Sequence, residues 1–344
     1  MNSRARPIST TTAPGLTHCF SWWEGQSVDI DGYTTRESAA DDLEDLRRAL
    51  GVPRLNLWGI SYGSHLALAY LKYHPARTER AALAGIEGLD QTVKLPAETD
   101  ALFARVQKLI DADSKAKAIY PDLAGLMRRV HAKLDAKPAE VTFTPQGAPA
   151  PVTIRFDGFV VQMAVGGLIS DPPRIAGVPL LYLALDNGAY EPFARILHQF
   201  FLSGPAGFAG MPEAMDLASG IDRERLALVE RQAGTGLLGD TLNFPMPQIA
   251  GIRPSLDLGR AFRAPFQSPA PVLFISGTLD GRTSVPEAKA TLRQFPRGRH
   301  LIVKNGGHNI FEADPRIADA VVAYFNGAPV PQETRFDPPA IKTP

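Results

Sequence analysis

The chain has 344 residues, of which 44% are hydrophobic and 21% are charged. This is the mixture of ordinary globular proteins, so the composition excludes a disordered or fibrous chain. Lys plus Arg and Asp plus Glu both number 36. Because neither sign forms a long block, the sequence lacks the electrostatic signature of binding to nucleic acid or to an anionic membrane. We therefore expect a peptide or small-molecule substrate, and the sequence leaves the oligomeric state open.

The cysteine content and the N-terminus limit the class of protein further. Cys19 is the single cysteine, which excludes an intrachain disulfide framework and a metal site built on several thiolates. We expect neither a metal nor a cofactor. No apolar run approaches the roughly 20 residues of a membrane span. The first 20 residues lack the apolar core of a secretory signal peptide, which favours a cytoplasmic location.

The first part of the chain alternates helices with strands. Residues 1–34 have no clear period and are expected to be irregular. Apolar spacing predicts a helix over 37–50, a buried strand over 54–59, a helix over 63–74 and a strand over 80–86. This alternation is typical of a parallel sheet with helices on its faces.

The middle of the chain has a different character. From residue 91 to 264, helical stretches are separated by Pro- and Gly-rich loops, which predicts a mostly helical insertion. The alternating pattern then resumes with a strand, helix, strand and helix at 271–277, 285–295, 299–305 and 315–325. We thus predict a discontinuous α/β core of residues 1–90 and 265–330, and a loose Pro-rich tail of residues 331–344.

One pattern suited to nucleophilic catalysis lies between the first predicted strand and the helix after it. A serine hydroxyl becomes a strong nucleophile when an imidazole removes its proton as it attacks. In the run Gly59-Ile60-Ser61-Tyr62-Gly63, the turn forces Ser61 into strained backbone geometry, and the flanking Gly59 and Gly63 leave the room that this turn needs. The alternative is a Gly-rich packing turn. The strand-to-helix context favours a nucleophile elbow.

The acid and the base are expected downstream, each on a loop after a later strand. Asp280 follows the strand of 271–277 in a polar turn, and its alternative role is that of an ordinary turn or capping residue. Among the seven histidines, His308 follows a strand through Gly306 and Gly307, which leave room for its ring to reach back over the sheet edge. The chain order Ser, Asp, His is the order that the elbow fold uses.

Two other histidines are weaker candidates. His300 lies at the start of the strand predicted over 299–305, which precedes His308, and is expected to point to solvent. His65 lies one helical turn after Ser61, where it either lines the site or lies on the helix surface.

These residues suggest a mechanism through an acyl-enzyme. His308 takes the Ser61 proton and returns it to the leaving group, while Asp280 fixes the tautomer of the imidazole. The N–H of Tyr62 is the expected oxyanion donor, because it follows the nucleophile.

Three segments, residues 33–75, 271–288 and 298–308, closely resemble the proline iminopeptidase and tripeptidyl aminopeptidase-like branch of the α/β hydrolases, peptidase family S33. The resemblance implies an α/β-hydrolase fold and the triad Ser61, Asp280 and His308. It also implies that the insertion of residues 91–264 is a helical lid over the site, and that the substrate is cleaved at its N-terminus.

The chain departs from that family before Ser61. Members begin with several strands and an HGGPG-type loop that supplies the second oxyanion donor, and no such stretch occurs in this sequence. We therefore expect the first strands of the usual fold to be missing. The lack of paired cysteines is a second departure from exported relatives.

Several functions stay open. The leading hypothesis is an aminopeptidase, in which Glu87 or Glu191 holds the substrate ammonium. The alternatives are a carboxylesterase on small apolar esters and a catalytically weak binding protein that keeps the fold.

Overall fold

The computed structural model describes residues 39–199 and 211–344. Its centre is a parallel sheet in the order β1-β2-β5-β6-β7, in which every pair of neighbours is parallel. The strands are β1 (Leu55–Ile60), β2 (Thr78–Ala84), β5 (Val272–Gly277), β6 (Gly298–Lys304) and β7 (Glu333–Arg335). Strands that precede and follow the long insertion in the sequence thus form one sheet, as predicted.

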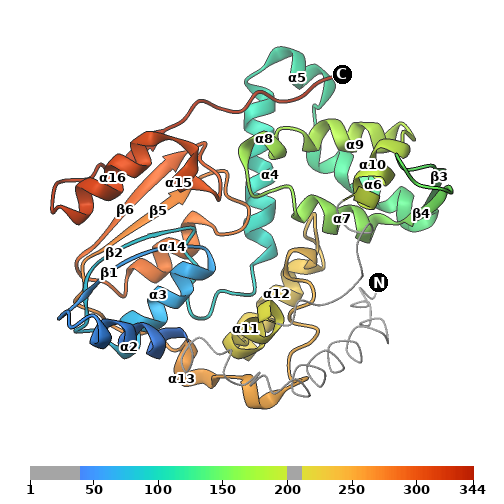
Figure 1. Ribbon diagram of the computed structural model, residues 1–344. Helices are drawn as coiled ribbons and strands as arrows, with labels where there is room; N and C mark the ends of the chain where they lie inside the picture. Colours follow the sequence, from blue (N-terminus) through green and yellow to red (C-terminus); the bar gives the residue numbers. More distant parts are fainter. Residues whose placement is uncertain (1–38, 200–210) are drawn as a thin grey trace.

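Helices cover both faces of the sheet (Figure 1). The helices of this core are α2 (Asp41–Ala49), α3 (Tyr62–Tyr73), α14 (Val285–Leu292), α15 (Ile310–Ala313) and α16 (Pro315–Phe325). Side chains alternate along a strand, so β2 turns Ala81 and Leu83 toward the cluster of α3, and Ala82 and Ala84 toward the cluster of α16. All four are fully buried. This two-sided burial explains why the strands read as continuous apolar runs.

The edge strand β1 is covered less completely within the described residues. Leu57 faces the core and is 7% exposed, whereas Trp58 on the opposite face is 67% exposed and contacts the ring of Phe311 edge-on at 5.2 Å between centroids. Among the described strands, β1 pairs only with β2.

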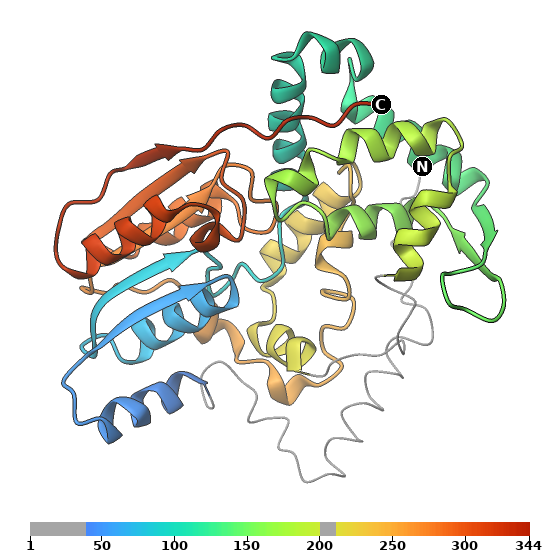
Figure 2. The same cartoon turned by 45° about the horizontal axis from the view of Figure 1, so that its top comes forward.

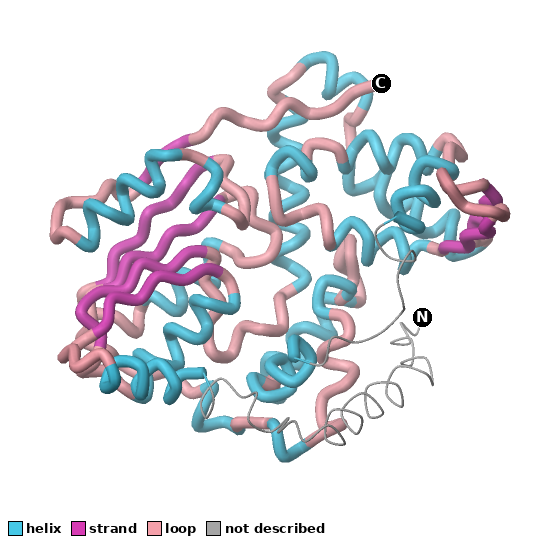
Figure 3. The backbone as a smooth tube through the Cα atoms, viewed as in Figure 1, coloured by secondary structure: helices cyan, strands magenta, loops and turns pink. Residues whose placement is uncertain are grey.

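The insertion lies beyond the carboxyl ends of the strands (Figures 1 and 2). Its first part has its own buried core, built largely from α4 to α10. The helices are α4 (Pro96–Asp111), α5 (Ser114–Ile119), α6 (Leu123–Ala136), α7 (Gly158–Gly166), α8 (Pro172–Ile175), α9 (Val178–Asp186) and α10 (Glu191–Leu197). An antiparallel hairpin of β3 (Ala139–Phe143) and β4 (Val152–Phe156) lies far from the central sheet (Figure 3). The sequence reading missed this hairpin.

The last part of the insertion packs against the core. It contains α11 (Met211–Ser219), α12 (Arg223–Ala233), two short 3₁₀ turns at Thr241–Asn243 and Pro254–Leu256, and α13 (Gly259–Arg263). Arg225 of α12 donates to Glu287 of α14 and to the carbonyl of Val93. Lys72 of α3 donates to three carbonyls at the end of α13. Charged side chains thus connect the insertion to the core at two places.

The C-terminal tail is ordered, so the prediction of a loose tail is wrong. Residues 333–335 pair with β6, and the tail then crosses to the insertion (Figure 2). There Lys342 donates its N–H to the Ala176 carbonyl and accepts from the Tyr120 hydroxyl. Backbone pairing, which composition does not reveal, holds this Pro-rich segment.

Other predicted elements agree with the structure apart from shifted ends. The helix predicted over 37–50 is α2, which begins at Asp41, and the strand predicted over 80–86 ends at Ala84. The predicted irregular segment of residues 1–34, and Cys19 with it, lies outside the described residues. The division into core and lid at residues 91 and 264 stays a prediction. In the described part of the chain, no helix has both the length and the apolar character needed to cross a membrane.

Candidate active site

Ser61 lies at the turn between β1 and α3, as the elbow pattern predicts. Its φ of 54° and ψ of −123° place it in a conformation that L-residues rarely adopt. Ser61 donates its N–H to the carbonyl of Ala84 at 3.1 Å, and its own carbonyl accepts from the Ser64 hydroxyl at 2.6 Å. Surrounding bonds therefore hold a strained residue in place, a combination that is concentrated at functional sites.

The two glycines that flank Ser61 differ in their surroundings. A Cβ atom built on Gly59 would lie 2.7 Å from the carbonyl oxygen of Gly63, so the turn requires glycine there. A Cβ on Gly63 would meet no described atom within 4 Å. The spatial argument for glycine thus holds at Gly59 and fails at Gly63.

Asp280 and His308 are hydrogen-bonded to each other. The distance from His308 Nδ1 to Asp280 Oδ2 is 2.9 Å; the Asp280 side chain is buried and the His308 side chain is 11% exposed. Because a carboxylate accepts, Nδ1 carries the proton and Nε2 keeps a free lone pair. Asp280 also accepts from the backbone N–H groups of Arg282 and Thr283 and from the Thr283 hydroxyl at 2.5 Å. These local bonds are those of an aspartate turn and fix the carboxylate, and the bond to His308 is the contact that an ordinary turn lacks.

The His308 ring lies against Gly85, which follows β2. A Cβ on Gly85 would be 3.0 Å from Cε1 of the ring, and φ at Gly85 is +51°, so this position strongly favours glycine. The sequence did not indicate Gly85. We expected Gly306 and Gly307 to leave room for the His308 ring, but these glycines contact other parts of the chain. The preceding residue, Ala84, accepts the N–H of Ser61, so Ser61 and His308 both lie at the carboxyl end of β2.

Within residues 39–199 and 211–344, the Ser61 hydroxyl forms no hydrogen bond to the His308 ring. Hydrogen bonds of this kind are commonly long before substrate binds, and they tighten in the complex.

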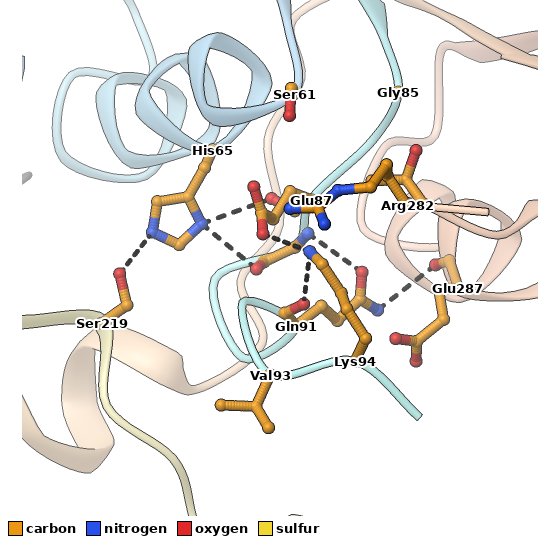
Figure 4. A network of polar contacts seen from close by, with 12 residues as sticks. Ser61, His65, Gly85, Glu87, Gln91, Val93, Lys94, Ser219, Arg282 and Glu287 are labelled. Carbon is orange, nitrogen blue, oxygen red and sulfur yellow. Dashed lines mark hydrogen bonds and ion pairs between the residues drawn. The ribbon is translucent and has the colours of Figure 1, made fainter. Parts of the chain in front are cut away.

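His65 is fully buried, so its interpretation as a helix-surface residue is wrong. Its Nδ1 lies 3.3 and 3.2 Å from the carbonyls of Glu87 and Gly88, and its Nε2 lies 3.0 Å from the Ser219 hydroxyl (Figure 4). Burial lowers the pKa of His65, so the ring is neutral. Since both nitrogens already have protein partners, His65 connects α3, the loop after β2 and α11 rather than contacting substrate.

Glu87 belongs to a cluster of charged groups below Ser61 in Figure 4. Its side chain is 12% exposed and forms an ion pair with Lys94. Burial alone would raise the pKa of Glu87, but the Lys94 ammonium, with smaller contributions from His65 and Arg282, lowers it overall. Burial and the charge of Glu87 raise the pKa of Asp216, on α11, to about 7. Asp216 is a carboxylate beside Glu87 that the sequence reading missed.

Two further candidates lie elsewhere. Glu191 begins α10, where it is exposed and forms an i,i+4 ion pair with Arg195. Since α10 and α3 lie on opposite sides of the molecule in Figure 1, the structure does not bring Glu191 to Ser61. His300 does not point to solvent as expected. It lies 2.9 Å from the Ser276 hydroxyl, and burial lowers its pKa to about 4.

Tyr62 is the first residue of α3, and its ring stacks obliquely on that of His65. Its N–H stays the predicted oxyanion donor. Among the described residues, no three His, Cys, Asp or Glu side chains are placed to bind a metal.

Comparison with known families agrees with this architecture. A family model described as the alpha/beta hydrolase fold matches residues 11–140, and one described as TAP-like protein matches residues 257–335. The chain has the α/β-hydrolase fold. The matched stretches lie on either side of most of the insertion, and they contain Ser61 in the first and Asp280 and His308 in the second.

Individual relatives match this chain over a short stretch or at low identity. A proline iminopeptidase of Xylella fastidiosa is 51% identical over 59 residues, which cover 17% of this chain and 18% of the relative. Among solved structures, a thermophilic esterase from Thermogutta terrifontis is 15% identical, with 86% of this chain and 72% of that chain covered and a TM-score of 0.34. A meta-cleavage product hydrolase from Pseudomonas fluorescens is 16% identical, with 85% and 72% covered and a TM-score of 0.39. At these TM-scores the likenesses carry no argument about the substrate.

Proposed function

We propose that this α/β-hydrolase chain is a serine hydrolase that cleaves amide or ester bonds through an acyl-enzyme on Ser61. The observation that carries the proposal is the hydrogen bond from His308 to Asp280, together with the strained turn that presents Ser61. A packing turn needs neither the strain nor the bonded pair.

In the proposed reaction, Ser61 Oγ forms a bond to the substrate carbonyl carbon while its proton passes to Nε2 of His308. Asp280 stabilises the resulting imidazolium, which already has its Nδ1–H aimed at the carboxylate. The N–H of Tyr62 donates to the oxyanion. The proton on Nε2 then passes to the leaving amine or alcohol as its bond to carbon breaks. Water repeats the cycle and releases the acid.

The finer proposal is an aminopeptidase that acts on peptide N-termini. It is supported by the TAP-like family match, by the short match to a proline iminopeptidase and by the carboxylates Glu87 and Asp216 near the site. An exopeptidase must bind the substrate ammonium, and a carboxylate is the natural partner. Asp216 is the better candidate of the two, because Glu87 is already paired with Lys94.

Labelling with a fluorophosphonate tests the hydrolase proposal. The folded protein should react at Ser61, and Ser61→Ala should remove the label without loss of structure. An unlabelled, folded wild-type protein would contradict a serine hydrolase.

Paired substrates test the finer proposal. An aminoacyl anilide should turn over faster than its N-acetylated form, and Asp216→Asn should raise KM for the free amine while leaving the acetylated substrate unaffected. Equal rates on the two anilides would favour the second candidate within the class, a carboxylesterase.

A candidate of another class is a binding protein that keeps the fold with little turnover. The lack of a hydrogen bond between Ser61 and His308 in the described residues is the observation in its favour. Ligand binding without phosphonate labelling would support it.

A further inference from the structure

Residues 169–171, in the short connection between α7 and α8, contact both loops that carry the proposed acid and base. The Gly281 N–H donates to the carbonyl of Ile169 at 2.9 Å, directly after Asp280. The His308 N–H donates to the carbonyl of Ser170 at 2.7 Å. These are backbone bonds between the insertion and the core.

Side chains continue the same contact. The Asn309 amide donates to both oxygens of Asp171, at 3.2 and 3.1 Å. Ile169 is fully buried, and it shares a hydrophobic cluster with Leu279, the residue before Asp280. The contact therefore includes residues on both sides of the acid and the base.

Close approach of the backbone explains two glycines of the core. A Cβ on Gly281 would lie 2.5 Å from the carbonyl oxygen of Ile169. A Cβ on Gly307 would lie 2.5 Å from Cδ of Pro172 and 2.8 Å from the carbonyl oxygen of Ser170. Distances this short leave no room for a side chain, so the sequence at both loops is adapted to residues 169–171.

We propose that residues 169–171 are a positioning segment for Asp280 and His308, so that the insertion is part of the proposed catalytic machinery. This inference rests on the proposed function. A loop that carries a general base must hold it to a fraction of an ångström, and an error of about 1 Å costs on the order of a hundredfold in rate. Neither loop is held by the sheet alone, because both lie beyond the carboxyl ends of their strands.

The first test displaces the segment with a methyl group. Gly281→Ala and Gly307→Ala should each slow phosphonylation of Ser61 by about ten- to a hundredfold and should shift the midpoint of its pH profile, because the hydrogen bond between His308 and Asp280 is disturbed. Gly166→Ala is the matched control. It lies in α7, three residues before the segment, and its Cβ would be in ordinary contact, 3.7 Å from Leu242. The control should keep the wild-type rate and pH profile.

The second test leaves the backbone intact, in case a glycine variant does not fold. Asp171→Ala removes the acceptor of Asn309 and should slow labelling by about three- to tenfold, as loss of one such bond predicts. Asp171→Asn keeps an acceptor and should recover most of the rate.

The outcomes separate the two proposals. If the wild-type protein is not labelled, the proposed function fails. If the wild type is labelled, and the folded variants at Gly281, Gly307 and Asp171 behave like Gly166→Ala, the positioning segment is wrong.

Discussion

At the residue scale, the site depends on which hydrogen-bonding groups already have protein partners. Among the described residues, His308 Nε2 has no hydrogen-bond partner, whereas both nitrogens of His65 have one. Hydrogen-bond partners therefore distinguish the proposed base, His308, from His65, which links parts of the fold. The same reasoning separates Asp216 from Glu87, which is paired with Lys94.

Asp280→Asn should lower kcat by about four orders of magnitude. The amide offers an N–H to His308 Nδ1, which favours the wrong tautomer. The N–H groups of Arg282 and Thr283 still find the amide oxygen, so the fold should persist. Steady-state kinetics together with a circular dichroism spectrum would check this, and a variant that retains a tenth of the activity would contradict a role for Asp280 in orienting the base.

Asp216→Asn should stabilise the protein at alkaline pH. An aspartate whose pKa rises from 3.8 to about 7 on folding binds a proton more readily in the folded state, so stability falls as pH rises through that window. Removing the charge should raise the free energy of unfolding at pH 8 by about 1–4 kcal/mol and should change it little at pH 4. Urea titrations at the two pH values measure the difference. An equal effect at both would mean that the carboxyl does not titrate in this window.

At the element scale, the insertion is tied to the core by a few specific links. Arg225 and Glu287 join α12 to α14, with side chains 12% and 15% exposed. Such pairs matter more than exposed ones, because removal of one partner leaves the other charge poorly solvated.

Glu287→Gln should therefore lower the free energy of unfolding by about 1–3 kcal/mol. Glu191→Gln is the control, since it breaks an Arg–Glu ion pair within one helix, whose side chains are 48% and 56% exposed. The control should cost about 0.5 kcal/mol or less. Denaturant unfolding of the two variants and the wild type compares them directly, and equal losses would show that burial does not strengthen the α12–α14 link.

At the scale of the whole molecule, buried histidines make the fold sensitive to acid. Burial lowers the pKa of His65, and it brings the pKa of His131 and of His300 to about 4. The unfolded chain binds protons at these sites near pH 6.5 and the folded chain does not. Stability contributed by the neutral rings is therefore present above about pH 6.5 and is lost as pH falls toward 4.

His300→Gln should flatten the fall in stability between pH 6.5 and 4 by about 1–3 kcal/mol. Thermal unfolding across this range is the measurement. A slope that is the same in the wild type and in His300→Gln would assign the acid sensitivity to other groups.

Local patterns predicted much of this protein. Alternating helices and buried strands indicated the parallel sheet, because apolar periodicity reports burial directly. The elbow around Ser61 was recognisable because its strained turn needs glycine at position 59. Asp280 and His308 could be ranked by loop context and chain order alone.

Contacts between distant segments were decided only by the tertiary structure. Nothing near Gly85 in the sequence indicates that it faces His308, and nothing in residues 169–171 indicates that they hold two loops more than a hundred positions away. The same limit explains the wrong predictions for His65, His300 and the C-terminal tail, whose surroundings come from other parts of the chain. Apolar periodicity predicts which residues are buried. Tertiary packing determines which side chains come into contact, and the hydrogen bonds and pKa shifts of this site depend on those contacts.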